Sequence, residues 1–129
     1  MKKMMIFGVL MFAISMVFGQ VDKIGLSFDQ IQLEYKTEIT GSGINENGQM
    51  FLVSESKDMS VTYVFDENAV CVICYVFPAN EKVYMEIVNG YNSGYNAVTN
   101  MKWKSKSNGS EVTIEQKTNA NSKVYFEIY

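Results

Sequence analysis

Histidine is absent from this sequence of 129 residues. Histidine is the commonest metal ligand and the commonest general acid or base, so its absence argues against most hydrolytic and metal-dependent sites. The sequence also lacks a G-x-S-x-G nucleophile elbow. Its carboxylates occur singly at strand ends and turns, as at Asp58, Asp66, Glu111 and Glu115. We therefore predict a protein that is not an enzyme and that holds no cofactor and no metal ion.

Cysteine is scarce, and the only two residues of this type, Cys71 and Cys74, form a C-x-x-C pair inside an apolar run. A redox C-x-x-C lies at a helix N-terminus, which lowers the pKa of one thiol. In a regular strand, side chains three residues apart point to opposite faces. We therefore predict that the two sulfurs diverge, that a mutual disulfide is geometrically poor, and that both thiols pack as small hydrophobic groups. If this stretch is not a strand, a redox-active C-x-x-C pair becomes a valid interpretation again.

Long hydrophobic runs are also lacking, except at the N-terminus. Lys2 and Lys3 precede the apolar stretch Ile6–Phe18, and Gly19 places a small residue before Gln20. This pattern is typical of a secretory signal peptide covering residues 1–19, with an uncleaved anchor or cleavage after Gln20 as alternatives. We expect a secreted or periplasmic bacterial protein with no membrane span after cleavage.

The formal net charge is −3, and loss of Lys2 and Lys3 with residues 1–19 would change it to −5. An acidic balance argues against nucleic-acid binding, which needs a basic stripe. The remaining residues 20–129 have the length of a single domain.

The most apolar stretch of that domain is AVCVICYVF, residues Ala69–Phe77, which Pro78 ends. It is rich in β-branched and aromatic residues, so we predict a strand. Both of its faces are apolar, whereas a strand covered on one side alternates apolar with polar residues. We expect it at the centre of the sheet, with its second face covered by curvature, by a loop or by a partner.

The chain before this strand predicts one helix and two strands. Ser27 and Gln30 form a capping-box pattern at the start of a helix over Phe28–Lys36, although the same stretch also alternates like a strand. Thr40–Gly48 is predicted to be a loop. The strands are predicted at Gln49–Glu55 and Ser60–Asp66.

The chain after it predicts a second helix and three strands. Asn80 can cap a helix over Glu81–Asn89, Gly90 can end it, and Asn92–Asn96 is polar. Three segments with a period of two follow, and the Asn108-Gly109 turn separates the first two of them. These strands are Ala97–Lys104, Glu111–Gln116 and Lys123–Tyr129. The fold class is therefore predicted as α+β: two α-β-β-β units forming one antiparallel sheet, with both helices packed on one face.

Aromatic residues near the second helix and the last strands suggest a binding surface. Tyr and Trp combine apolar area with a polar tip and are favoured at interfaces. The candidate residues are Tyr91, Tyr95, Trp103 and Tyr125, with Tyr129 nearby. The alternative for Tyr91 and Trp103 is the core, because both lie on inward-facing stripes.

Three functions are compatible with these features of the sequence. The first is a non-enzymatic module that binds a protein partner in the envelope or outside the cell. The second is a carrier of a small hydrophobic ligand or a carbohydrate, with a pocket lined by Tyr63, Phe65, Phe77 and Tyr84. The third is a hydrolase.

Two sequence stretches, IGLSFDQIQLEYK and SVTYVFDENAVCVICYVF, resemble small secreted bacterial proteins built on an α-β-β-β unit. These include the β-lactamase-inhibitor-protein-like and PepSY-like folds. Gly25–Ser27 and Tyr63–Val70 carry the resemblance, over about half of the predicted mature chain. The resemblance implies a non-enzymatic binding or inhibitory module, and it transfers no functional residue.

Overall fold

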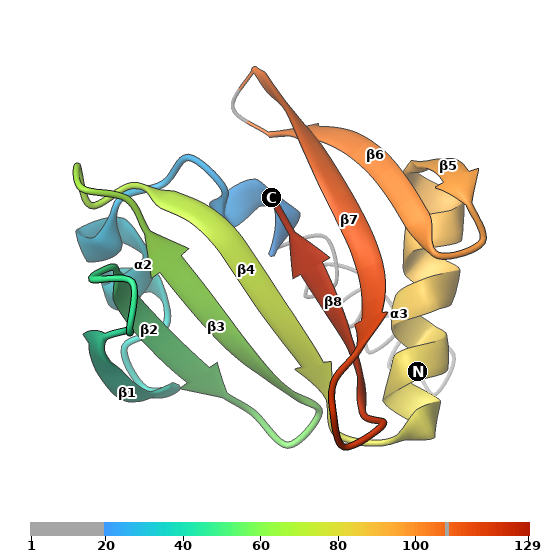
Figure 1. Ribbon diagram of the computed structural model, residues 1–129, viewed down its shortest axis with the longest axis horizontal. Helices are drawn as coiled ribbons and strands as arrows, with labels where there is room; N and C mark the ends of the chain where they lie inside the picture. The colour runs from blue at the N-terminus through green and yellow to red at the C-terminus, as the bar shows by residue number, and fades with distance from the viewer. Residues whose placement is uncertain (1–19, 108) are drawn as a thin grey trace, which may run out of the picture.

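The computed structural model describes residues 20–107 and 109–129 (Figure 1). The predicted signal peptide and Asn108 lie outside these ranges. The described chain folds as α+β, with a short 3-10 helix η1 (Val21–Lys23), the helices α2 (Phe28–Glu34) and α3 (Glu81–Gly94), and one antiparallel sheet. Its strands are β1 (Ile39–Ile44), β2 (Met50–Glu55), β3 (Met59–Phe65), β4 (Cys71–Pro78), β5 (Asn96–Thr99), β6 (Lys102–Ser107), β7 (Ser110–Thr118) and β8 (Val124–Ile128).

The strand order in the sheet is β1-β2-β3-β4-β8-β7-β6-β5. The apolar strand β4 therefore lies at the centre, as predicted. Within the described residues, each α-helix is followed by four strands, so the predicted run of three strands is wrong in both halves. The predicted duplication of one unit is not confirmed.

The strand β1 is the first addition to the predicted fold. The sequence predicts Thr40–Gly48 to be a loop because Gly41, Gly43 and Asn47-Gly48 can supply turn conformations. The structure instead pairs Gly41 with Val53 and Gly43 with Phe51. Backbone hydrogen bonds to β2 outweigh the local propensity, and the glycine at position 48 turns the chain with φ of +78°.

The second addition is β5, which follows a helix longer than predicted. Gly90 does not end α3: it is buried inside the helix, which continues to Gly94. The next residue, Tyr91, packs edge-on against Phe126 and keeps the last turns on the sheet. The predicted strand over Ala97–Lys104 is split by a turn at Met101, which separates β5 from β6.

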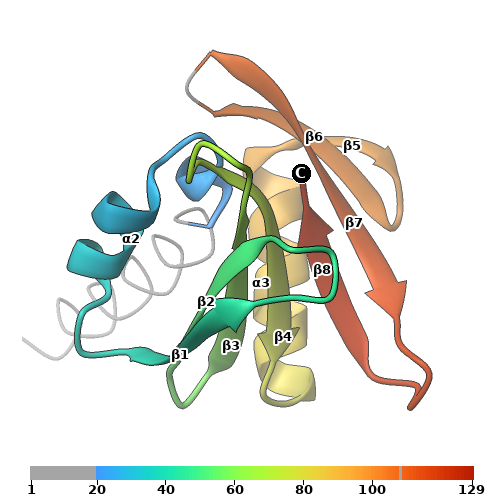
Figure 2. The same ribbon diagram turned by 60° about the vertical axis from the view of Figure 1, so that its left-hand side comes forward.

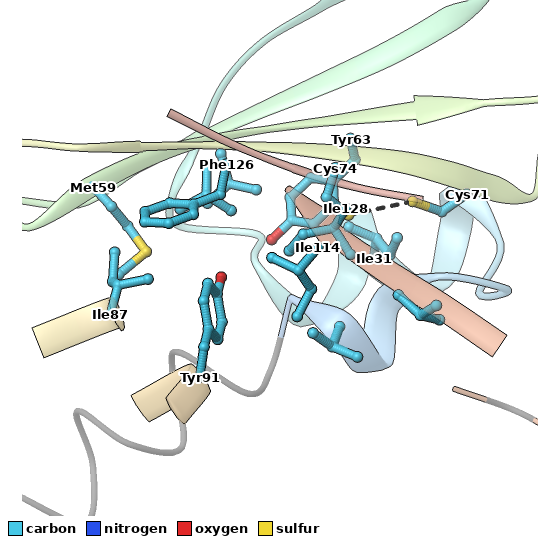
Figure 3. Close-up of a cluster of buried hydrophobic side chains, with 14 of the residues drawn as sticks. Ile31, Met59, Tyr63, Cys71, Cys74, Ile87, Tyr91, Ile114, Phe126 and Ile128 are labelled. Atoms are coloured by element: carbon cyan, nitrogen blue, oxygen red, sulfur yellow. Dashed lines mark hydrogen bonds between the residues drawn. The ribbon is translucent and has the colours of Figure 1, made fainter. Parts of the chain in front are cut away.

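Both α-helices pack on the same face of the sheet (Figure 2). Phe28 at the start of α2 contacts Phe65 of β3 with ring centroids 5.1 Å apart. Tyr84 of α3 stacks on Phe126 of β8 at 5.9 Å. The inward rows of the strands meet these helices in one core, which Figure 3 shows around Met59. The capping box of α2 is present as predicted, with Ser27 Oγ accepting from Gln30 N.

A short N-terminal segment, residues 20–27, closes the core where β4 and β8 separate. These two strands pair along only Cys74–Val76 of β4. Beyond that stretch, Gly25 N donates to Cys71 O at 2.8 Å and Cys71 N donates to Leu26 O at 2.7 Å. Val21 of this segment is fully buried. The N-terminal segment thus covers the first residues of β4.

A β-bulge at the start of β4 overturns the prediction for the cysteines. Val64 pairs with Ile73 but Phe65 pairs with Cys71, so Val72 is an extra residue without a partner on β3. One extra residue shifts the alternation by one position. Cys71 and Cys74 therefore face the same side, both are buried, and their sulfurs lie 3.7 Å apart instead of diverging.

Candidate functional site

The four aromatic residues predicted as a binding surface do not share one surface. Tyr91 and Trp103 are 1% and 0% exposed and belong to the core, which was the alternative interpretation. Trp103 Nε1 donates to Asn92 Oδ1 at 2.8 Å, which satisfies its only polar group. Burial raises the pKa of Tyr91. Neither side chain can reach a partner from this position.

Tyr95 and Tyr125 are half-buried and lie on opposite sides of the sheet. Tyr95 caps α3 and packs against Tyr91 on the helix side, with ring centroids 5.8 Å apart. Burial, and then the charge of Asp22, raise the pKa of Tyr95. Tyr125 neighbours Phe126 in β8 and therefore points to the other face. Of the four, only Tyr125 lies on the face that the helices leave uncovered.

That uncovered side, which we call the open face, is apolar along β4. Cys74 and Val76 point into the core, and the residues between and beside them, Ile73, Tyr75 and Phe77, point outward and are half-buried. Neighbouring strands continue this apolar surface through their register partners. The partners are Phe51, Val53 and Thr62, which are half-buried, and Val64, which is 4% exposed. The prediction that both faces of β4 are packed therefore holds for the helix side only. On the other face these residues are half-buried, and no other described element lies over them (Figure 1).

Three aromatic residues form a cluster at the centre of the open face, across the junction of β4 and β8. The rings of Phe77 and Tyr125 stack at 5.4 Å with 26° between their planes. Tyr75 lies 6.2 Å from Tyr125 at 57°. We call Tyr75, Phe77 and Tyr125 the aromatic cluster. Burial, and then the charge of Glu127, raise the pKa of Tyr75.

The β6–β7–β8 half of the open face is charged, and its charges are paired. Lys104 lies 3.0 Å from Glu111 and Lys102 lies 3.6 Å from Glu115. Lys117 also forms an ion pair with Glu127. Exposed pairs of this kind contribute only about 0.2–1 kcal/mol each to stability. Their effect here is to leave the charged half with little net charge.

Glu115 is the most strongly contacted of these carboxylates. Tyr129 Oη donates a hydrogen bond to Glu115 Oε1. This bond is the main reason that the pKa of Glu115 is lowered; burial opposes it, and the positive charges of Lys102 and Lys117 lower the pKa further. Tyr129 is 41% exposed and marks the edge of the open face beside β7.

The residues predicted to line a ligand pocket do not converge on one. Tyr63 and Phe65 are fully buried in the core, and Tyr84 stacks on Phe126. Phe77 lies on the opposite face, in the aromatic cluster. Among the described residues, a cavity of about 30 Å³ lies beside Gln20, Ser54 and Val61. It has room for a water molecule or two and not for a lipid or a sugar.

A wider surface groove runs between two hairpin turns and contains two carboxylates. Its walls include Asn47–Met50, Asp66 and Glu67. Asp66 Oδ1 already accepts the backbone N–H groups of Asn68 and Val70, so it stabilises its own turn. Within residues 20–107 and 109–129, no cluster of acidic or cysteine side chains has the arrangement of a metal site.

Two of the four residues predicted for a binding surface, Tyr91 and Trp103, lie in the core, and the outward row of β4 was not among the predicted residues. The outward row Ile73, Tyr75 and Phe77 is visible as a period of two within the apolar strand. In the described part of the chain, no helix has the length and apolar character needed to cross a bilayer. Comparison of the chain with protein-family models, with curated proteins and with solved structures found no match.

Proposed function

We propose that the protein is a secreted or periplasmic, non-enzymatic binding module that holds another protein against its open face. The observation that carries the proposal is the outward row of β4. Ile73, Tyr75 and Phe77 have the composition of core residues, yet they are only half-buried. Leaving such side chains in water costs free energy that contact with a partner would recover. An apolar row on a central strand without a covering layer therefore favours an interface.

The size of the surface agrees with this proposal. Strands lie about 4.8 Å apart and rise about 3.3 Å per residue, so the five residues Ile73–Phe77 and their neighbours on β2, β3 and β8 have a footprint of roughly 300 Å². A standard protein interface buries about 800 Å² on each partner, with an apolar centre and a polar rim. The paired charges of β6, β7 and β8 would supply the rim. The aromatic cluster would supply the centre, where Tyr is enriched among residues that dominate binding.

The chemistry of the surface favours a protein over a carbohydrate or an anionic polymer. One face of the Phe77 ring and one face of the Tyr125 ring are covered by their mutual contact, which reduces the ring surface on which a sugar could stack. Lys102, Lys104 and Lys117 are paired with Glu115, Glu111 and Glu127, so the charges of this half alternate in sign and form no basic stripe for a polyanion. A partner with an apolar centre and mixed charges at its margin is the complementary surface.

The cellular location is part of the proposal. Lys2 and Lys3 followed by the apolar run Ile6–Phe18 support export of the chain. The resemblance carried by Gly25–Ser27 and Tyr63–Val70 supports an inhibitor-like role in the envelope or outside the cell.

The experiment compares capture by matched variants of the exported chain. The wild type, the double variant Phe77→Ala/Tyr125→Ala and the control Leu33→Ala are immobilised and exposed to envelope and secreted fractions. Leu33 lies on α2, away from the open face, and is 75% exposed. Circular dichroism first establishes that all three are folded. A protein captured by the wild type is then purified and titrated calorimetrically against each variant.

We expect the double variant to bind the captured protein at least about 30-fold more weakly than the wild type does. This factor corresponds to about 2 kcal/mol, which is typical for truncation of side chains at the centre of an interface. Leu33→Ala should bind like the wild type. The proposal is overturned if no protein is captured specifically, or if a captured protein binds the folded double variant as tightly as the wild type.

A further inference from the structure

The two cysteines are the only thiols of the chain, and the structure brings them into contact. Their Sγ atoms lie 3.7 Å apart, and Cys71 and Cys74 are 1% and 0% exposed (Figure 3). Among the described residues, the other polar neighbours of these sulfurs are backbone carbonyls. Cys74 Sγ lies 3.7 Å from Gln20 O, and Cys71 Sγ lies 3.6 Å from Ile73 O.

This contact exists because of the bulge and would not arise in a regular strand. Residues i and i+3 of a regular strand point to opposite faces, which keeps their sulfurs apart. The extra residue, Val72, has no partner on β3 and turns Cys71 back to the core side. A bulge therefore does here what a helical turn does in other C-x-x-C pairs: it places both sulfurs on one side within reach of each other.

We propose that Cys71 and Cys74 are a disulfide-forming pair that closes into an intrachain bond by exchange with a small disulfide or a dithiol oxidase. The thiolate of one cysteine attacks the disulfide of the oxidant, which forms a mixed disulfide and releases one thiolate. The thiolate of the second cysteine then attacks the protein sulfur of the mixed disulfide. This step forms the Cys71–Cys74 bond and releases the second thiolate of the oxidant. The oxidant takes up two electrons, and the two cysteine protons end on its thiols.

The local structure can accommodate the bond. A disulfide needs the sulfurs about 2.05 Å apart, so they must approach from the observed 3.7 Å. Cys71 is the first residue of β4, and its backbone is held on one side by the N-terminal segment through Gly25 and Leu26. Val72 has no ladder partner on β3. Cys71 is paired with Phe65 of β3 on its other side, so we expect the approach of the sulfurs to move the backbone at Val72 rather than at Cys71.

Access to the pair is controlled by the N-terminal segment. Gln20 lies against Cys74, and Val21 is fully buried in the same cluster. An oxidant can reach the sulfurs before this segment has docked or when it opens. Burial, and then the neighbouring Cys71 thiol, raise the pKa of Cys74, so little of Cys74 is thiolate in the closed native state. Exchange should thus be slow in the folded protein and fast in the opened one.

The test is a redox titration of the exported chain with mixtures of oxidised and reduced dithiothreitol. Each sample is incubated in dilute urea to allow opening, returned to buffer, quenched with acid, denatured and alkylated with N-ethylmaleimide. Intact mass spectrometry then counts the alkylated thiols. A non-reducing gel separates intrachain from interchain bonds.

We expect a monomer with no alkylated thiol in oxidising mixtures, with native circular dichroism, and two alkylated thiols after reduction. The matched control is Cys74→Val/Val76→Cys, which keeps the composition and an inward-facing, buried position but moves one thiol two residues, about 6.6 Å, further along β4. It should retain its thiols in mixtures that close the wild type. The proposal is overturned if the wild type keeps both thiols under the most oxidising mixture, forms only dimers, or unfolds on closure. If the control forms its intrachain disulfide in the same mixtures as the wild type, the geometric basis of the proposal is overturned.

This inference is independent of the proposed function. The thiols lie on the core side of β4, whereas the aromatic cluster lies on the open face. Loss of partner binding in the open-face variants would leave the redox titration unchanged.

Discussion

The rings of Phe77 and Tyr125 stack across the junction of β4 and β8 at 5.4 Å. This contact lies one position beyond the last backbone pair of the two strands, Val76 with Phe126. It therefore joins the two halves of the sheet on the side that the helices leave uncovered. The same two side chains are central to the proposed interface and to the cohesion of the sheet.

The first prediction is an energetic coupling between these two rings. Aromatic pairs contribute about 0.5–1.5 kcal/mol beyond the area they bury. A double-mutant cycle with Phe77→Ala, Tyr125→Ala and the double variant should give a coupling of about 1 kcal/mol in urea unfolding. Strict additivity of the two single effects would show that the stacked rings do not stabilise the junction.

A second prediction concerns the turn that leads into β4. Ala69 has φ of +60°, in the left-handed region where a side chain is strained. Ala69→Gly should therefore raise the free energy of unfolding by about 1 kcal/mol, because the strain costs more than the added chain entropy. Ala120, in another turn, does not have a positive φ. The control Ala120→Gly should be neutral or destabilising; stabilisation by both, or by neither, contradicts the account.

Much of the core was predictable from alternation alone. Val112 and Ile114 on β7, and Phe126 and Ile128 on β8, were expected inward and are fully buried. Their period of two is set by the pleat, so the sequence carries it directly.

Two features were not predictable for physical reasons. The strand β1 depends on backbone pairing with β2, and the small residues Gly41–Gly43 carry no alternating pattern that would predict this pairing. The bulge at Val72 is a single unpaired residue within an apolar run, where either alternation frame looks equally good. That one residue decides whether the thiols of Cys71 and Cys74 meet. For the candidate site, the sequence pattern already offered burial in the core as the alternative for Tyr91 and Trp103. The exposure of the outward row of β4 could not be predicted, because it depends on whether another element covers that face.

The third prediction is a pH effect at the edge of the open face. The hydrogen bond from Tyr129 lowers the pKa of Glu115 below the ordinary value of a glutamate carboxyl. Tyr129→Phe should therefore raise this pKa toward the usual value, as measured by NMR titration of the Glu115 carboxyl carbon. A lowered carboxyl pKa stabilises the folded state above the unfolded pKa, and the effect is lost as the pH falls through the folded value.

The control for this effect is Tyr125→Phe, on the same strand but in contact with Tyr75 and Phe77 and not with Glu115. It should leave the Glu115 titration unchanged. A Tyr129→Phe variant with an unaltered Glu115 pKa would show that the hydrogen bond does not form in solution.

The fourth prediction tests the N-terminal segment as the cover of the thiols. Val21→Ala and Val112→Ala each remove two methyl groups from fully buried positions and should each cost about 2 kcal/mol. Val21 belongs to the N-terminal segment, whereas Val112 lies on β7. The rate of N-ethylmaleimide modification in native buffer should rise at least about tenfold more for Val21→Ala than for Val112→Ala, because local opening is governed by local stability. Equal rates would mean that the thiols are reached only by global unfolding.

The most direct test of the proposed function is hydroxyl-radical footprinting of the protein with its captured partner. Bound partner should lower the modification of Tyr75, Phe77 and Tyr125, the aromatic cluster on the open face. Met85 of α3 is 49% exposed on the helix side and serves as an internal control that should not change. Protection of Met85 without protection of the aromatic cluster would place the partner on the helices and contradict the account.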